Sequence, residues 1–227
     1  APEQKQQVQK LDASGKVLPQ RQFAVEDWPV MDAQVRFEGK KIVDAAQVPI
    51  ENLSANWIME AGVLRFEPLR FRIAGGTVNA NINLDSNAKP LAGKLKIDLT
   101  GVNLRTLVPG SGKMQDPLGI LYGRIDIAGR GASIASLFGT ADGRLALLVN
   151  GGHMSNLLVE LVGLDVAEAL RILATKDPDV RLRCAVADLA IKAGTATPQV
   201  LVIDTTDTVV TGSGSIDFKT ESLNLVT

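Results

Sequence analysis

The sequence predicts a mainly β protein: an elongated, twisted, antiparallel-type sheet whose apolar face is either covered or left open as a β-groove. Three observations support this prediction. Apolar and polar residues alternate with a period of two in many short runs, turn residues separate the runs, and one long segment, residues 155–175, has the spacing of a helix. We therefore expect nearly all of the ordered chain to be strand.

A hairpin gives the cleanest alternation. Leu69, Phe71 and Ile73 alternate with arginines, and Gly75-Gly76 then supplies a turn. The return strand carries apolar residues that alternate with three asparagines, namely Val78, Ala80, Ile82 and Leu84. Comparable alternation follows at 94–99, 125–127, 145–149, 180–186 and 216–225. These runs predict further strands, so the sheet extends along most of the chain.

One segment departs from this period. Between residues 155 and 175 the apolar positions recur three and four residues apart, as on one face of a helix. Asp165 and Glu168 have the spacing of a capping box, and Pro178 follows as a stop signal. We predict a helical insert of one or two pieces, which could fold over the apolar face of the sheet.

The chain divides into two parts by composition. Residues 1–22 are polar and aperiodic, which indicates a linker or a truncated arm, and residues 23–227 form one β domain that contains the insert. The sequence starts at Ala1 rather than Met, so we expect it to be a piece of a longer protein. No apolar run reaches the roughly 18 residues that a spanning helix needs.

Two stretches echo each other. Ala61-Gly62 leads through Leu69 and a turn to the run at 82–84, and Ala193-Gly194 leads through Leu201 and a turn to the run at 216–218. A hairpin with one apolar face cannot bury that face alone. Repeated hairpins therefore predict a sheet that grows by stacking one unit on the next.

Composition excludes several functions. The formal charge is −1 and aromatic residues make up 4% of the chain, so neither electrostatic attraction nor base stacking favours a nucleic-acid partner. The single Cys184 excludes an intrachain disulfide, and the single His153 excludes a multi-histidine metal site. We predict no cofactor and no metal, and we expect Cys184 to be a small residue of the core.

No complete catalytic motif is present. The sequence 131–135 resembles a nucleophile elbow around Ser133, with His153 as the only histidine base, but Ala135 replaces the final glycine. Ser133 at the start of a turn or short helix explains this sequence better. The stretch 109–114 lacks the first glycine and the final hydroxyl residue of a phosphate loop. We expect a protein that is not an enzyme.

The apolar strand faces remain as the candidate site. In a sandwich a second sheet covers such faces, whereas in a sheet that curls without closing they line a groove suited to acyl chains. Composition leaves both arrangements open. The residues that we predict to line a lipid groove share one alternating face of the first strands, and they are Leu69, Phe71, Ile73, Ile82, Leu84, Leu95, Ile97 and Leu99.

Several ordered blocks resemble a known family. They are Gly62–Phe71 with Ala74-Gly75-Gly76, Gly123–Gly131, Ala141–Leu145, Leu164-Asp165, Arg183–Asp188 and Val202–Thr205. Together, over roughly residues 28–227, they resemble the C-terminal periplasmic region of AsmA-family proteins of Gram-negative bacteria. The family has no catalytic residues to carry over to this sequence.

The resemblance implies a protein tethered to the inner membrane by an N-terminal anchor that precedes this sequence, with its body in the periplasm and a role in outer-membrane biogenesis. It also implies kinship with bridge-like lipid transport proteins, whose sheets curl into an apolar groove. Phospholipid, or another lipid with acyl chains, is then the expected partner. The alternative is a structural or interaction module that assists outer-membrane assembly through protein partners.

Overall fold

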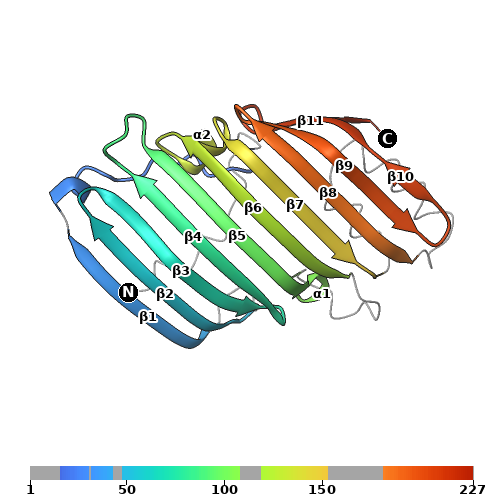
Figure 1. Ribbon diagram of the computed structural model, residues 1–227, viewed down its shortest axis with the longest axis horizontal. Coiled ribbons are helices and arrows are strands. Elements are labelled where there is room, and N and C mark those ends of the chain that lie inside the picture. The colour runs from blue at the N-terminus through green and yellow to red at the C-terminus, as the bar shows by residue number, and fades with distance from the viewer. Residues whose placement is uncertain (1–15, 31, 43–47, 108–118, 153–180, 227) are drawn as a thin grey trace, which may run out of the picture.

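A single antiparallel sheet makes up the fold (Figure 1). The computed structural model describes residues 16–30, 32–42, 48–107, 119–152 and 181–226. The strands follow one another in sheet order β1-β2-β3-β4-β5-β6-β7-β8-β9-β11-β12, and β10 pairs with β9. The two outer strands, β1 and β12, do not pair with each other, so the sheet is open. The prediction of a mainly β, antiparallel, elongated sheet is confirmed.

The strands are mostly nine to twelve residues long. Their bounds are β1 Ala33–Ile42, β2 Ile50–Glu60, β3 Val63–Ile73, β4 Gly76–Asp85, β5 Ala92–Asn103, β6 Ile120–Arg130, β7 Asp142–Asn150, β8 Leu182–Lys192, β9 Thr195–Thr205, β10 Val209–Thr211, β11 Ser213–Asp217 and β12 Ser222–Val226. Within the described ranges the helical pieces are short, and they are η1 Trp28–Val30, α1 Leu104–Leu107 and α2 Ile134–Phe138. The helical insert predicted at 155–175 lies outside the described residues.

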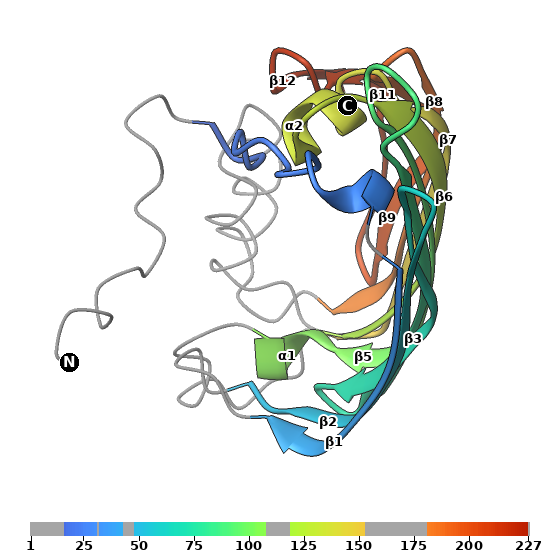
Figure 2. The same cartoon turned by 90° about the vertical axis from the view of Figure 1, so that its left-hand side faces the viewer.

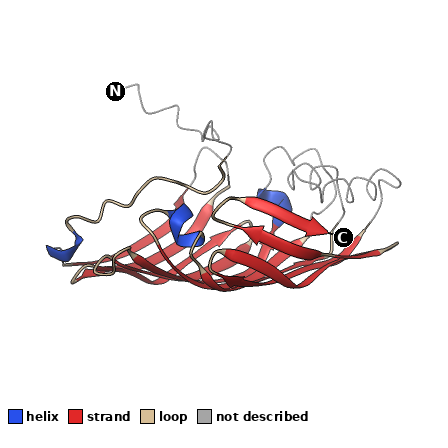
Figure 3. Ribbon diagram, turned by 90° about the horizontal axis from the view of Figure 1, so that it is seen from above, coloured by secondary structure: helices blue, strands red, loops and turns tan. Residues whose placement is uncertain are grey.

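The sheet is bent into an arc. Viewed end-on in Figure 2, the strands curve from one rim to the other, and both α1 and α2 lie on the inner side of the arc. Figure 3 shows the same arrangement from above, with these helices on one side of a single layer of strands. We call the inner side the concave face and the outer side the convex face.

Local irregularities keep the apolar residues on one face. In β3 the register shifts between Phe66 and Leu69, so these residues lie three apart in sequence yet both stay in the apolar rows, opposite Ile82 and Ala80. The extra residues of a bulge change the phase of the alternation by one position. Similar shifts occur in β2, β5, β8 and β9.

One such shift corrects the prediction for Cys184. The register slips between Leu182 and Cys184, and Cys184 then pairs with the polar residues Asn150 and Asp204. Ala185 therefore lies on the concave face, where the alternation had placed Cys184. Cys184 is therefore half-buried among polar partners rather than part of the core, because the unbroken alternation at 180–186 does not reveal the bulge.

The buried core lies beneath α2, at β6 to β9. Ala141 is 1% exposed and Ala196 is 0% exposed, and they pack with Ile127 and Ile191. Phe138 from α2 meets Phe218 edge to face, with ring centroids 5.7 Å apart and planes at 76°. Such aromatic pairs add to the burial of their own area, so α2 and the C-terminal hairpin are held together over this part of the sheet.

Glycine allows α2 to approach the sheet closely. A Cβ atom at Gly129 in β6 would lie 2.1 Å from the carbonyl oxygen of Leu137 in α2. Side chains larger than hydrogen are therefore excluded there. Ser133 caps the helix: its side chain accepts the N–H of Ser136, and the Ser136 hydroxyl accepts the N–H of Ser133.

The convex face carries cross-strand ion pairs at β5 to β8, next to a short apolar row of Tyr122, Leu148, Val186 and Val202. Asp98 pairs with Arg124 at 2.8 Å, and Lys96 pairs with Asp126 at 3.0 Å. Arg144 in β7 also donates two hydrogen bonds to Asp188 in β8. Exposed pairs of this kind add little stability each, but they make this face soluble without a second layer.

Three hairpins turn through an Ala-Gly pair. Ala61, Ala74 and Ala193 have φ of 47°, 49° and 49°, and each is followed by a glycine with φ of 77° to 79°. Positive φ at both central residues is the geometry of a type I′ turn, whose twist matches that of the strands. The two sequence echoes thus begin with the same turn, as the repeated hairpin units predicted.

Alanine at positive φ is strained, so relieving that strain should stabilise the sheet. We expect Ala61→Asn and Ala193→Asn each to raise the free energy of unfolding by about 1 kcal/mol, since asparagine tolerates the left-handed region. Urea unfolding measures the change. Ala132→Asn is the control, because Ala132 is exposed and is not among the residues at positive φ. An equal gain in the control would contradict the account.

The Arg144–Asp188 pair should make stability depend on acid pH. The hydrogen bonds from Arg144 lower the pKa of Asp188 in the folded protein. The stabilisation is therefore complete above the carboxyl's ordinary pKa and is lost as the pH falls through the lowered pKa. Between about pH 5 and pH 3, Asp188→Asn should lose less stability than the wild type.

Urea midpoints at each pH test this expectation. Asp207→Asn, in the exposed loop between β9 and β10 and outside the ion pair, serves as the matched control. If Asp188→Asn and the wild type lose the same stability in acid, the pair does not contribute to folding.

Candidate functional site

The concave face carries rows of apolar residues that cross the strands. Register partners in neighbouring strands lie side by side, so each row can be followed from strand to strand. One row runs through eleven strands: Val35, Trp57, Phe66, Ile82, Leu95, Ile127, Gly143, Ile191, Ala196, Ile216 and Leu223. Every position in it is apolar or glycine.

Two further rows run beside the first. The second contains Phe37, Ala55, Leu69, Ala80, Ile97, Ile125, Leu145, Leu189 and Pro198. The third contains Phe71, Val78, Leu99, Gly123, Leu147, Ala187 and Leu201. Because the rows cross the strands, they follow the long axis of the sheet and form a continuous apolar track.

The structure brings the eight predicted lining residues together on this track. Ile82 and Leu95 lie in the first row, Leu69 and Ile97 in the second, and Phe71 and Leu99 in the third. Leu84 pairs with Gly93 at one flank, and Ile73 pairs with Gly76 at the other. All eight are half-buried, so each keeps apolar surface that its own strands do not cover. Their contact with lipid stays a prediction.

A cavity of about 240 Å³ lies between the sheet and α2. Its floor is the concave face, including Ile82, Leu84 and Leu95 from the predicted set. Its other walls come from residues that the sequence analysis did not assign to a site, namely Phe23, Ile127, Ile134, Leu137, Phe138 and Ala141. The lining is apolar apart from Lys94, so the cavity suits hydrocarbon rather than a polar ligand.

A sequence signal for this cavity existed. Ser133 and Ser136 have capping spacing, and the apolar residues at 134, 137 and 138 have helical spacing. The prediction that Ser133 starts a turn or short helix is confirmed, but the sequence analysis did not connect this helix with the apolar face. The Phe23 contribution had no local signal, because it depends on a contact more than a hundred residues away.

The residues considered as catalytic or phosphate-binding candidates have the following positions. Ser133 is buried and its hydroxyl is engaged at the start of α2, 3.0 Å from that of Ser136. His153 and the stretch 109–114 lie outside the described residues. Across the described part of the chain, no cluster of three or more His, Cys, Asp or Glu residues has metal-binding geometry. Within the same ranges, no helix has the length and apolarity to cross a membrane.

Comparison with known proteins identifies the family. The family model described as "AsmA family" matches residues 1–201. The AsmA family protein YhjG of Escherichia coli (strain K12) is 39% identical over 223 residues, which cover 98% of this chain and 32% of that protein. The chain thus spans about a third of the length of this relative. No solved structure matches it significantly. The chain belongs to the AsmA family.

Proposed function

We propose that the concave face holds phospholipid acyl chains and guides them along the sheet. The observation that supports this most strongly is the unbroken apolar row across eleven strands, beside which two further rows run. Strands lie about 4.8 Å apart, so ten steps give a track of roughly 48 Å. Where the row is uncovered, an acyl chain that moves by one strand leaves one apolar side chain and meets another, whereas Ile127, Ile191 and Ala196 of the row are buried under α2 and the C-terminal hairpin.

The hydrophobic effect should make a bound acyl chain leave the groove slowly but move easily along the track. Burying a methylene group stabilises by about 0.8 kcal/mol, so an acyl chain is held as long as its surface stays covered. Sliding from one strand to the next keeps that surface covered. Leaving the track exposes it again. A groove of this kind therefore directs lipid lengthwise without a chemical step, and we propose that the role is not enzymatic.

Family membership supports a role in outer-membrane assembly or lipid transport. Within that role we propose a protein of the Gram-negative periplasm, tethered to the inner membrane, in which this region forms one section of a longer apolar path. The apolar track recognises acyl chains, so we propose phospholipids as the class of ligand.

A second candidate is a structural module that acts through protein partners. One observation favours it: at β6 to β9 the concave face is packed against α2 and the C-terminal hairpin, with Ala141 and Ala196 completely buried. If other segments close the rest of the face in the same way, no lipid path remains. The helical insert predicted at 155–175 is one segment that would close the face under this second function.

A pair of charged substitutions on the track separates the two functions. We expect Ile82→Asp with Ile97→Asp to abolish co-purification of phospholipid, because two carboxylates would have to lose water in an apolar groove. Native mass spectrometry with lipid extraction measures the bound lipid. The matched control is Asn81→Asp with Thr100→Asp, which adds the same charge at exposed positions of the same strands on the convex face.

The control should keep its phospholipid, and circular dichroism should show that both variants are folded. A folded track variant with undiminished phospholipid would contradict the lipid groove. A wild-type protein that carries no phospholipid under gentle extraction would favour the structural module.

A further inference from the structure

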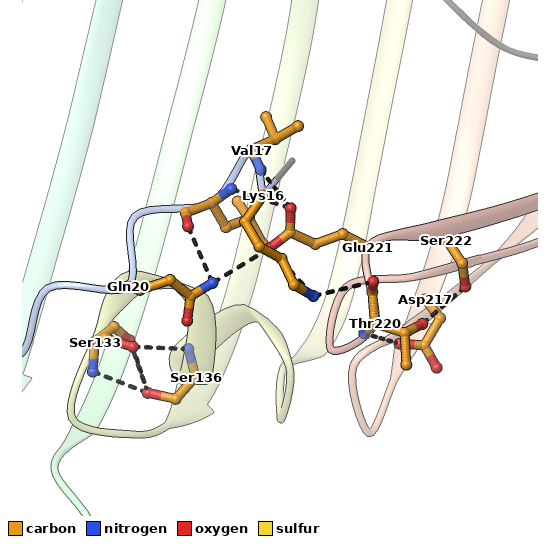
Figure 4. A network of polar contacts seen from close by, with 10 residues as sticks. Lys16, Val17, Gln20, Ser133, Ser136, Asp217, Thr220, Glu221 and Ser222 are labelled. Carbon is orange, nitrogen blue, oxygen red and sulfur yellow. Dashed lines mark hydrogen bonds and ion pairs between the residues drawn. The ribbon is translucent and has the colours of Figure 1, made fainter. Parts of the chain in front are cut away.

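The N-terminal segment Lys16–Phe23 forms a strap that is tied to the opposite end of the chain. Its contacts converge on Glu221, in the turn between β11 and β12 (Figure 4). The backbone N–H groups of Val17 and Leu18 both donate to one carboxylate oxygen of Glu221. The other oxygen accepts the side-chain amide of Gln20 at 3.3 Å and lies 4.0 Å from the ammonium of Lys16. We call this arrangement the latch.

The far end of the strap reaches α2 and the cavity. The carbonyl of Pro19 accepts the N–H of Ala135 at 3.1 Å, and the N–H of Phe23 donates to the carbonyl of Ala132 at 2.8 Å. Gln22 and Ser133 form an antiparallel bridge between these bonds. Phe23 itself lines the cavity. The strap thus crosses from the C-terminal hairpin over α2 and ends as one wall of the apolar cavity.

Glu221 is an unusual residue for its position. Its φ is 57°, in the left-handed region that asparagine and glycine adopt more readily. Its side chain is nevertheless only 11% exposed, because the strap covers it. A glutamate at this position costs the turn some stability, and the contacts with the strap offset that cost. The residue type is therefore explained by the latch rather than by the turn.

Besides these polar contacts and a hydrogen bond from Lys16 to the Thr220 carbonyl, the strap makes few buried apolar contacts. Five of its eight residues are exposed, and Val17 keeps 77% of its surface in contact with water. Segments with few buried apolar contacts open at low free-energy cost, independently of the rest of the fold. The core under α2 contains none of the strap residues. Release of the strap would thus leave the sheet and α2 in place while removing Phe23 from the cavity.

We infer that the strap is a releasable cover, latched by Glu221, over an acyl-chain site formed by the cavity beneath α2. The inference rests on the proposed function, since it makes the cavity a holding site for one phospholipid acyl chain where the first row of the track passes under α2. The occupant is assigned from the lining, which is hydrocarbon from both the sheet and the helix. Opening the latch exposes the cavity and lets the chain enter or leave.

Glu221→Asn is the most direct variant. It removes the carboxylate that the strap binds, while asparagine suits the left-handed backbone of the turn, so the fold should be as stable as the wild type or more so. Loss of several hydrogen bonds to a charged group should raise the rate of acyl-chain uptake on the order of tenfold. Ala61→Asn, which changes a left-handed turn residue away from the strap, should leave the rate unchanged.

A reversible crosslink tests the opposite direction. Gln22 and Ser133 face each other as a narrow, non-hydrogen-bonded antiparallel pair, the spacing that suits a disulfide. We expect Gln22→Cys with Ser133→Cys, in a background with Cys184→Ala, to slow uptake when oxidised and to recover when reduced. The reduced protein carries the same Ser133→Cys change, so it controls for the loss of the helix cap that Ser133 provides.

Stopped-flow fluorescence gives the rates, with parinaroyl phosphatidylcholine in vesicles of phosphatidylethanolamine and phosphatidylglycerol as the probe. Faster uptake by Glu221→Asn and slower uptake by the oxidised crosslink are the expected results. Wild-type uptake with rates that neither change affects would overturn the cover and leave the proposed function standing. No uptake by the wild type would overturn the proposed function, and the cover with it.

Discussion

The structure depends on keeping one face of a single-layer sheet apolar across eleven strands in register. A strand directs successive side chains to opposite faces, so a slip of one residue in any strand would move its apolar side chains to the wrong side. No second sheet is present in the described residues to correct such an error. The bulges of β2, β3, β5, β8 and β9 change the phase of the alternation where the sequence requires it. The groove is the consequence of this register.

The fixed register also explains why the two faces of the sheet differ in polarity. The convex face meets water directly, so it carries ion pairs such as Asp98 with Arg124 and Lys96 with Asp126 across neighbouring strands. The concave face is buried under α2 and the C-terminal hairpin, and Ala55, Val78 and Ala80 are also buried in its second and third rows. Elsewhere its residues stay half-exposed, as Ile97 and Leu99 do. A face that remains partly uncovered along its length is unusual for a structural core and suits a transient apolar ligand.

Much of this architecture could be predicted from period-two alternation. The hairpin through Leu69 and Ile82 and the common face of the eight lining residues follow from local pattern, because alternation and turns are encoded over a few residues. The bulge beside Cys184 could not be predicted, since one extra residue leaves no mark on composition. The latch on Glu221 joins segments about two hundred residues apart, and no local pattern reports such a contact. Long-range polar contacts such as the latch are therefore the features that could be found only from the structure.

Under the proposed function, the cavity and the track have different roles. Where it is uncovered, the track offers one apolar position after another, which favours movement, whereas α2 and Phe23 form walls of the cavity, which favours retention. A strap whose latch centres on one carboxylate can connect movement and retention, because its release changes access to the cavity without unfolding the sheet. The account thus needs no energy source within this region and no catalytic residue. It needs a continuous apolar surface and a cover that opens.

Site-specific photocrosslinking in living cells tests the central claim most directly. Benzoylphenylalanine would be placed singly at Ile97 and Leu99 on the concave face and at Lys96 and Thr100 on the convex face of the same strand. Mass spectrometry would then identify covalent adducts. The account predicts phospholipid adducts at 97 and 99 and none at 96 and 100. Adducts in equal yield on both faces, or protein adducts alone at 97 and 99, would contradict a lipid-holding groove.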